Sequence, residues 1–247
     1  MSGFPVEFRK VGFEIDGRVI LRDISLTIEP GETMVLLGRS GSGKTTALRL
    51  INGLLMPASG EVRVDGKSTR EWDPVRLRRS IGYVIQDGGL FPHFSVERNV
   101  GLVPRLEAWD ETRVQARIAD LLTRVGLPDA EFGQRLPREL SGGQRQRVGV
   151  ARALAADPSL LLFDEPFGAL DPVTRLDLQR EFLRLRGELG TTSVFVTHDV
   201  REAAKLGTRI ALLDKGSVVF TGTPEEFHAC EQEEARAFLA VLEEGGA

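Results

Sequence analysis

The segment that most constrains the fold covers residues 34–46, MVLLGRSGSGKTT, where an apolar run is followed by glycines, a lysine and two threonines. Gly38, Gly43, Lys44 and Thr45 have the spacing of a phosphate-binding loop. Glycines let the backbone bend so that successive N–H groups point at phosphate oxygens, and a helix that begins near Lys44 adds its positive N-terminal end. The segment therefore predicts a strand, a loop that binds a nucleoside triphosphate, and a helix.

Within this loop, different residues are expected to contact the phosphates and the metal. Lys44 is expected to reach the β- and γ-phosphates, and the Thr45 hydroxyl is expected to bind Mg²⁺. An ordinary Gly/Ser turn is the simpler alternative, but the buried-strand run before the loop and the amphipathic segment after it favour nucleotide binding. The predicted nucleotide contacts in the loop are Gly38, Ser40, Gly41, Ser42, Gly43, Lys44, Thr45 and Thr46.

Composition narrows the class of protein. The 247 residues suffice for one large or two small domains with an ample core. With 32 Lys and Arg against 36 Asp and Glu, the net charge of −4 argues against binding to nucleic acid. The single cysteine, Cys230, suits a reducing compartment. No apolar run approaches the roughly 18 residues that span a bilayer, and the N-terminus lacks the core of a signal peptide, so we expect a soluble cytoplasmic protein.

Short apolar runs alternate with segments of helical period. A helix is expected over residues 114–125, and another after an N-cap at Asp171 with Pro172 in the first helical position. This alternation predicts an α/β fold with a largely parallel sheet, while the Asp-Gly turn in residues 62–68 predicts an antiparallel hairpin nearer the N-terminus. The expected strands are residues 6–11, 24–28, 35–37, 81–85, 160–163, 194–197 and 210–213.

Polar side chains follow several of these runs at the point where each expected strand ends. Because ligands of an open parallel sheet bind at the carboxyl ends of its strands, we expect these side chains to converge on one edge. Asp164 can hold the hydration shell of Mg²⁺, and Glu165 can orient and deprotonate an attacking water. A lone Gln or His here is usually structural, but the shared position predicts nucleotide hydrolysis. The residues concerned are Lys44, Thr45, Gln86, Asp164, Glu165 and His198.

The segment LSGGQRQRVGVARAL, residues 140–154, indicates the family. Taken alone it would be an N-capped helix, whose serine hydroxyl and glycine N–H groups can bind an anion. Together with the other motifs it makes the chain resemble the ATP-binding subunits of ABC transporters over nearly its whole length. The matching residues are Ser141-Gly142-Gly143-Gln144 for the signature motif, Gln86 for the Q-loop, Ala169-Leu170-Asp171 for the D-loop and His198 for the switch histidine.

The resemblance implies a fold and a set of site residues. The fold is a P-loop NTPase core with a largely parallel sheet, an N-terminal antiparallel β subdomain and an α-helical subdomain inserted at about residues 88–156. The ATP-binding domain would cover residues 5–228, and residues 229–247 would form a short acidic helical tail. Catalysis is assigned to Gln86, Glu165 and His198, Mg²⁺ binding to Thr45, Gln86 and Asp164, and further ATP contacts to Ser141, Gly142, Gly143, Gln144 and Asp171.

The same resemblance implies partners. Two copies would close head to tail around two ATP molecules, so that the phosphate loop of one chain faces Ser141 of the other, and hydrolysis would reopen them. The dimer would drive transmembrane permease subunits, received near residues 86–93, and would serve an extracytoplasmic solute-binding protein indirectly. The chain would then be a peripheral subunit at the cytoplasmic face of the membrane, with no nucleic acid as partner.

One position departs from the family pattern. An aromatic residue normally stacks on adenine a few residues after the first strand, but spacing back from Lys44 places Ile15 there. Phe13 could replace it only if the loop is shifted. Loss of a stacked ring would remove about 1–3 kcal/mol of binding free energy, which affects adenine affinity rather than hydrolysis.

The transported solute is suggested only by finer resemblance. Residues 82–110 and 162–185 are most similar to the ATPases of osmoprotectant importers, which take up quaternary amines such as glycine betaine, choline or carnitine. Some of those carry regulatory domains after the ATPase, whereas this sequence ends with an expected acidic helix at residues 231–244. The alternatives are an importer of amino acids or other small solutes and, from another class, a soluble ABC ATPase without a transport role.

Overall fold

The computed structural model describes residues 3–86, 88–168 and 170–244. Ala169 of the expected D-loop and residues 245–247 of the expected tail lie outside this part of the chain. The chain divides into two compact units, which we call unit 1 (Met1–Arg78 with Thr191–Ala247) and unit 2 (Arg79–Gly190). Helix α2, Pro74–Arg79, spans the boundary between them.

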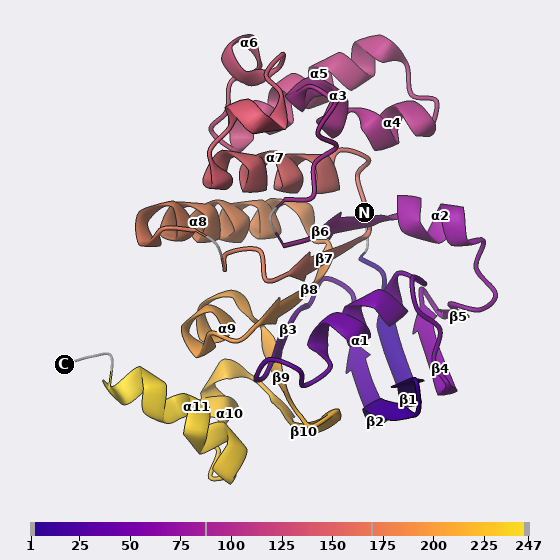
Figure 1. The fold of residues 1–247 in the computed structure, drawn as a ribbon, viewed down its shortest axis with the longest axis vertical. Helices are drawn as coiled ribbons and strands as arrows, with labels where there is room; N and C mark the ends of the chain where they lie inside the picture. The colour runs from indigo at the N-terminus through magenta and orange to yellow at the C-terminus, as the bar shows by residue number, and fades with distance from the viewer. Residues whose placement is uncertain (1–2, 87, 169, 245–247) are drawn as a thin grey trace. The chain divides into compact units, whose positions relative to one another are not determined.

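Unit 1 contains an antiparallel sheet of order β2-β1-β4-β5 (Figure 1). Its strands are β1 Val6–Ile15, β2 Arg18–Ile28, β4 Ser59–Val64 and β5 Lys67–Ser68. The turn at Asp65 and Gly66 has positive φ at both residues, 53° and 69°, as a type I′ hairpin requires. Since Val64 pairs with Lys67 across it, the hairpin predicted from the sequence is confirmed.

Unit 1 also contains the adjacent strands β10-β9-β3-β8. Strands β3 Thr33–Leu37, β8 Thr192–Thr197 and β9 Arg209–Asp214 are parallel, and β10 Ser217–Gly222, which the sequence analysis did not anticipate, runs antiparallel to β9. Every residue of β3 and β8 is buried, as expected for parallel strands covered on both faces. The helices of this unit are α1 Lys44–Ile51, α9 Val200–Leu206, α10 Pro224–His228 and α11 Glu233–Glu244.

Unit 2 pairs the parallel strands β6 Ile81–Val84 and β7 Leu160–Asp164 with a group of helices. Figure 1 shows α3 to α6 gathered on one side of α7 and α8 on the other. The expected helical insertion at residues 88–156 falls within this unit. The helices are α3 Val96–Val100, α4 Leu102–Leu106, α5 Glu111–Arg124, α6 Asp129–Phe132, α7 Gly142–Leu154 and α8 Pro172–Leu189, with a 3₁₀ turn at Pro137–Glu139.

The helices predicted from periodicity form as expected. In α5 the apolar positions Val114, Ile118 and Leu122 are buried. Helix α8 begins after Asp171, whose Oδ1 accepts hydrogen bonds from the N–H groups of Val173 and Thr174 at 3.1 and 3.0 Å. No helix among the described residues is long and apolar enough to cross a membrane.

Candidate nucleotide-binding site

The phosphate loop connects β3 to α1 in unit 1, and its bend requires glycine. Gly41 and Gly43 have φ values of 81° and 103°, a region that residues with a Cβ rarely adopt. A Cβ on Gly41 would meet no atom within 4 Å, so its requirement is conformational, whereas a Cβ on Gly43 would also lie 2.5 Å from the Leu21 side chain. The spacing of glycines noted in the sequence is therefore a backbone requirement of this loop.

The lysine of the loop is folded back over it. Lys44 begins α1, is 4% exposed, and its Nζ donates to the carbonyl oxygens of Gly38 and Arg39 at 2.8 and 2.9 Å. Ser42 is 5% exposed, and its Oγ has no hydrogen-bond partner among the described residues. A buried hydroxyl without a partner costs about 1–3 kcal/mol, and a phosphate oxygen in the loop would remove that cost. The loop thus fits a phosphate group.

The other predicted contact residues of the loop differ in their exposure. Ser40 is exposed, while Thr45 and Thr46 are half-buried in the first turn of α1. The backbone N–H groups of Ser42 to Thr46 lie where the loop passes into the helix, which is the arrangement that favours anions.

His198 follows β8, the parallel neighbour of β3, with Leu37 paired to Thr197. The phosphate loop and His198 therefore leave the same edge of unit 1. The turn is fixed by a buried pair, because Thr197 Oγ1 donates to Glu202 Oε2 at 2.7 Å and accepts from the N–H of Asp199 at 3.0 Å. His198 itself is exposed. Glu202 was not among the residues predicted from the sequence, because its role depends on a contact that forms only when the first turn of α9 folds back towards Thr197.

A cavity of about 420 Å³ lies beside these two segments. It is lined by Arg39 of the phosphate loop, by His198 and Arg201, and by Ala237 and Phe238 of α11. Neither the Arg39 nor the Arg201 guanidinium makes an ion pair within the described residues. The Asp199 carboxylate also lines the cavity, which therefore has two cationic groups and one anionic group beside an apolar wall. The amphipathic pattern of α11 did not reveal that it borders the candidate site.

In unit 2, the candidate metal and catalytic residues follow the other pair of parallel strands. Val84 pairs with Phe163, so Gln86, two residues beyond β6, and Asp164, the last residue of β7, lie at the same edge of this pair. Asp164 is 8% exposed and accepts a hydrogen bond from Tyr83 Oη at 3.3 Å. Gln86 is exposed. Within each unit, the predicted site residues therefore follow parallel strands at the same edge. That all six residues converge on one edge stays a prediction.

Glu165 has an unusual backbone conformation. Its φ is 46°, in the left-handed region, where a residue with a side chain costs roughly 1–3 kcal/mol. The turn it begins closes through a hydrogen bond of 3.3 Å from the Gly168 N–H to its carbonyl oxygen. No sequence pattern had indicated this conformation directly after β7.

The expected signature motif forms the start of α7. Ser141 Oγ accepts from the Gln144 N–H at 3.2 Å, and Gln144 Oε1 accepts from the Ser141 N–H at 2.8 Å, which is a capping box. Ser141 and Gly142 are exposed. A Cβ on Gly143 would lie 2.6 Å from the Thr174 side chain, so this glycine permits close packing of α7 on α8. The start of α7 is therefore exposed at Ser141 and Gly142, while the Ser141 N–H and the Gln144 side chain serve the cap.

Of the expected D-loop, Leu170 is 9% exposed and Asp171 caps α8. Hydrogen bonds from the side chain and backbone of Thr174 hold the pKa of Asp171 below its usual value. The Asp171 carboxylate therefore accepts hydrogen bonds at the N-terminus of α8 and is also exposed at the surface.

The two candidates for adenine contact differ in exposure. Ile15, at the end of β1, is 49% exposed, whereas Phe13 is 8% exposed and packed in unit 1. A flat base can therefore lie on Ile15 without rearrangement, but the Phe13 ring would first have to leave the core.

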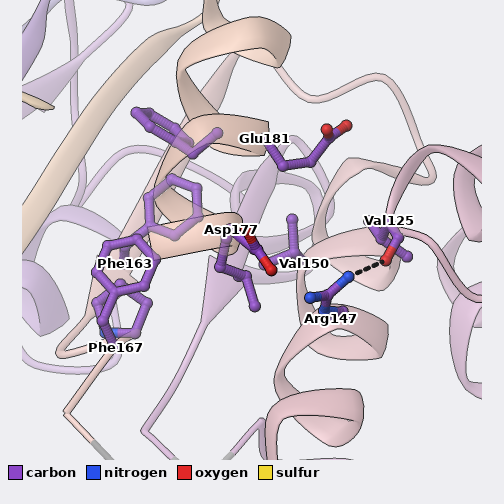
Figure 2. A pocket seen from close by; sticks show the side chains of 10 residues that line it. Val125, Arg147, Val150, Phe163, Phe167, Asp177 and Glu181 are labelled. Atoms are coloured by element: carbon purple, nitrogen blue, oxygen red, sulfur yellow. Dashed lines mark hydrogen bonds between the residues drawn. The ribbon is translucent and has the colours of Figure 1, made fainter. Parts of the chain in front are cut away.

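A second cavity, in unit 2, does not fit a nucleotide. It is lined by Phe163, Phe167 and Phe182, with Asp177 and Arg147 nearby (Figure 2). Its volume of about 20 Å³ has room for only one or two water molecules. It is a packing gap behind β7.

With this geometry established, comparison with known proteins identifies the family. Residues 21–168 match the ABC transporter family. The chain belongs to the ABC transporter family. It is 51% identical over 210 residues to the glycine betaine/carnitine/choline transport ATP-binding protein OpuCA of Bacillus subtilis, covering 85% of this chain and 55% of that protein. It is 48% identical over 219 residues to the glycine betaine uptake system ATP-binding protein YehX of Escherichia coli, covering 89% and 71%.

Solved ABC structures confirm the predicted fold. MJ0796, an ATP-binding cassette described as dimeric and bound to ADP and Pi, has a TM-score of 0.80 and 35% identity, covering 89% of this chain and 98% of that one. CbiO1 of Clostridium perfringens has a TM-score of 0.83 and 29% identity, covering 92% and 91%. The chain spans about half the length of OpuCA and of several other curated ABC relatives.

Proposed function

We propose that this chain is the ATP-hydrolysing subunit of an ABC importer for a quaternary-amine osmoprotectant such as glycine betaine, choline or carnitine. The observation that supports ATP binding is the phosphate loop, where Lys44 folds back onto the carbonyls of Gly38 and Arg39 and the buried Ser42 hydroxyl has no hydrogen-bond partner in the described part of the chain. The solute part is supported by about half-identical relatives whose names include glycine betaine, carnitine and choline.

ATP would bind through its phosphates. Lys44 would exchange its two carbonyl partners for β- and γ-phosphate oxygens, with the loop glycines and the N–H groups of residues 42–46 around them. Adenine would lie against the exposed Ile15. Arg39 and Arg201, which line the cavity beside His198, would add positive charge near the terminal phosphate.

Hydrolysis would depend on residues that follow the parallel strands. Glu165 would orient the attacking water and accept its proton, while His198 and Gln86 would contact the γ-phosphate and the water. Thr45, Gln86 and Asp164 would hold Mg²⁺; their hydroxyl, amide and carboxylate oxygens are the donors that this ion prefers. When bound, Mg²⁺ neutralises charge that develops on the phosphates.

A second copy of the chain would complete each site. The exposed Ser141 and Gly142 at the start of α7 would bind the γ-phosphate of ATP held by the partner's phosphate loop. Gln144 and Asp171 would support this contact through the helix caps they form, and Gly143 would support it by letting α7 pack closely on α8. The dimer would act from the cytoplasmic face of the membrane on transmembrane permease subunits, supplied with solute by an extracytoplasmic binding protein.

The experiment that tests this function is ATPase activity in a reconstituted complex. The chain would be co-purified with an integral membrane protein encoded by a neighbouring gene, and the complex would be placed in liposomes with a candidate solute-binding protein. Glycine betaine, choline or carnitine should stimulate phosphate release several-fold, while amino acids and Fe³⁺ should not. Stimulation by an amino acid alone would overturn the solute assignment, and absence of ATPase activity in every condition would overturn the proposal as a whole.

A mixed dimer tests the shared site. Ser141→Arg and Lys44→Ala homodimers should each fail to occlude ATP, because each carries one lesion in both composite sites. The mixed dimer places both lesions in one site and leaves the other whole, so it should occlude about one nucleotide. No occlusion in the mixed dimer, with wild type competent in the same assay, would contradict a site built from two chains.

A further inference from the structure

The chain contains a single tyrosine, and that tyrosine touches the candidate metal carboxylate. Tyr83 lies on β6, and its hydroxyl donates to Oδ2 of Asp164 at 3.3 Å. This distance is longer than the usual range of an O–H···O bond, about 2.5–3.0 Å, so the contact is a weak hydrogen bond. Both residues belong to unit 2, in neighbouring parallel strands.

The strand register explains why the contact forms. Tyr83 pairs with Leu162, and side chains two residues apart in a strand share a face, so Asp164 lies diagonally across from Tyr83 on the same face. Asp164 is 8% exposed and Tyr83 is half-buried. Water therefore competes poorly for the carboxylate, and a hydrogen bond to a charged acceptor is stronger than one between neutral groups.

We propose that Tyr83 is a positioning residue for Asp164. Its hydroxyl would fix the rotation of the Asp164 carboxylate, so that one carboxylate oxygen is already oriented towards the hydration shell of the ion. Carboxylates that hold metals are themselves hydrogen-bonded, and loss of such a partner typically weakens metal binding about 10- to 100-fold. Because the Tyr83 bond is long, we expect the lower end of that range. The metal part of this inference rests on the proposed ATPase function, whereas the contact between Tyr83 and Asp164 does not.

The competing explanation is that Tyr83 serves only as an aromatic ring that packs on its neighbours. Tyr83→Phe separates the two roles, because it keeps the ring and removes only the hydroxyl. A packing role predicts that this variant binds metal like the wild type. A positioning role predicts a selective loss of metal affinity with unchanged stability and unchanged nucleotide binding in the absence of metal.

The contact itself can be measured in the full chain without nucleotide. Because there is one tyrosine, protein labelled with ¹³C at the tyrosine Cζ gives one resonance, whose position depends on the hydrogen bond of the hydroxyl. Asp164→Asn should shift this resonance, whereas the control Asp177→Asn, an exposed carboxylate on α8, should not. An unmoved resonance in Asp164→Asn would overturn the contact.

The effect on metal binding is measured with Mn²⁺ as a paramagnetic probe and a non-hydrolysable ATP analogue. In Tyr83→Phe the dissociation constant of Mn²⁺ should rise about tenfold, while the analogue binds equally well without metal. Equal Mn²⁺ affinity in the two proteins would overturn the positioning role and leave the proposed function intact. Failure of the wild type to bind Mn²⁺ with the analogue would count against both.

Discussion

Arg152 of α7 provides a test of how the loop after Gln86 is held. Its Nη1 and Nη2 donate to the carbonyl oxygens of Gly89 and Gly88 at 2.9 and 3.1 Å. Burial lowers the pKa of the Arg152 guanidinium. Of its two acceptors, Gly88 is buried and Gly89 is exposed. Since α7 begins at the signature serine, Arg152 ties that helix to the loop.

The free energy with which Arg152 holds the loop can be estimated from these two hydrogen bonds. A hydrogen bond from a charged donor contributes about 1.5–3 kcal/mol. Arg152→Lys replaces the two-donor fork of the guanidinium with a shorter side chain that ends in one ammonium, so we expect it to lose one of the two bonds. The variant should lose about 1.5–3 kcal/mol of local stability, which raises the opening of the loop roughly 10- to 150-fold.

Hydrogen exchange reports this opening residue by residue. The Gly88 amide, which donates to Ile85 O at 3.2 Å, should exchange faster by that factor in Arg152→Lys. The Phe91 amide is a reference that should not change, because it donates to the buried Asn99 side chain at 2.8 Å.

The matched control is Arg147→Lys, on the same helix; the Arg147 guanidinium donates to Val125 O at 3.2 Å and has no hydrogen bond to the described residues of the loop. It should leave the exchange of Gly88 unchanged. If Gly88 exchanges at the same rate in Arg152→Lys, Arg147→Lys and wild type, Arg152 does not hold the loop.

Three further predictions concern chemistry, stability and pH. Glu165→Gln should still bind ATP but lose at least about 100-fold in phosphate release, because an amide cannot accept the water's proton; turnover within a few-fold of wild type would show that Glu165 is not the base. Thr197→Val removes the buried hydrogen bond to Glu202 and should lower the free energy of unfolding, measured by urea denaturation, by about 1–3 kcal/mol. An unchanged urea midpoint would refute this. The hydrogen bond from Arg105 lowers the pKa of Glu111 from 4.5 to about 2. The stability that this contact contributes is therefore present above pH 4.5 and is lost as the pH falls towards 2. Glu111→Gln should flatten the pH dependence of the free energy of unfolding in that window, and superimposable curves for the variant and wild type would contradict this.

The parts of the site that the sequence predicted are those formed by neighbours in the chain. The bend at Gly41 and Gly43 is a backbone requirement, and the cap of α7 joins Ser141 to Gln144, three residues apart. Interactions of this kind depend on spacing alone, so a pattern of letters suffices to find them.

The contacts that the sequence analysis missed join distant residues. Tyr83 reaches Asp164 only because β6 and β7 pair in one register, and Arg152 reaches Gly89 across 63 residues. A shift of one residue in the register would move the Tyr83 side chain to the opposite face of the strand pair. Such contacts therefore depend on how elements pack, which periodicity does not determine.

The sequence of this chain indicates the transported solute only weakly, and the physical reason is different. Specificity is a difference between the binding free energies of two ligands, and it arises in groups that touch those ligands. Under the proposed function, Lys44, Glu165 and Asp164 act on phosphate, water and metal, whichever solute crosses the membrane. Substitutions there should scale transport of every solute alike. By the same reasoning, the chain paired with a foreign permease that accepts its surface should transport that permease's solute, and a changed order of preference among solutes would show that this subunit contributes to selectivity.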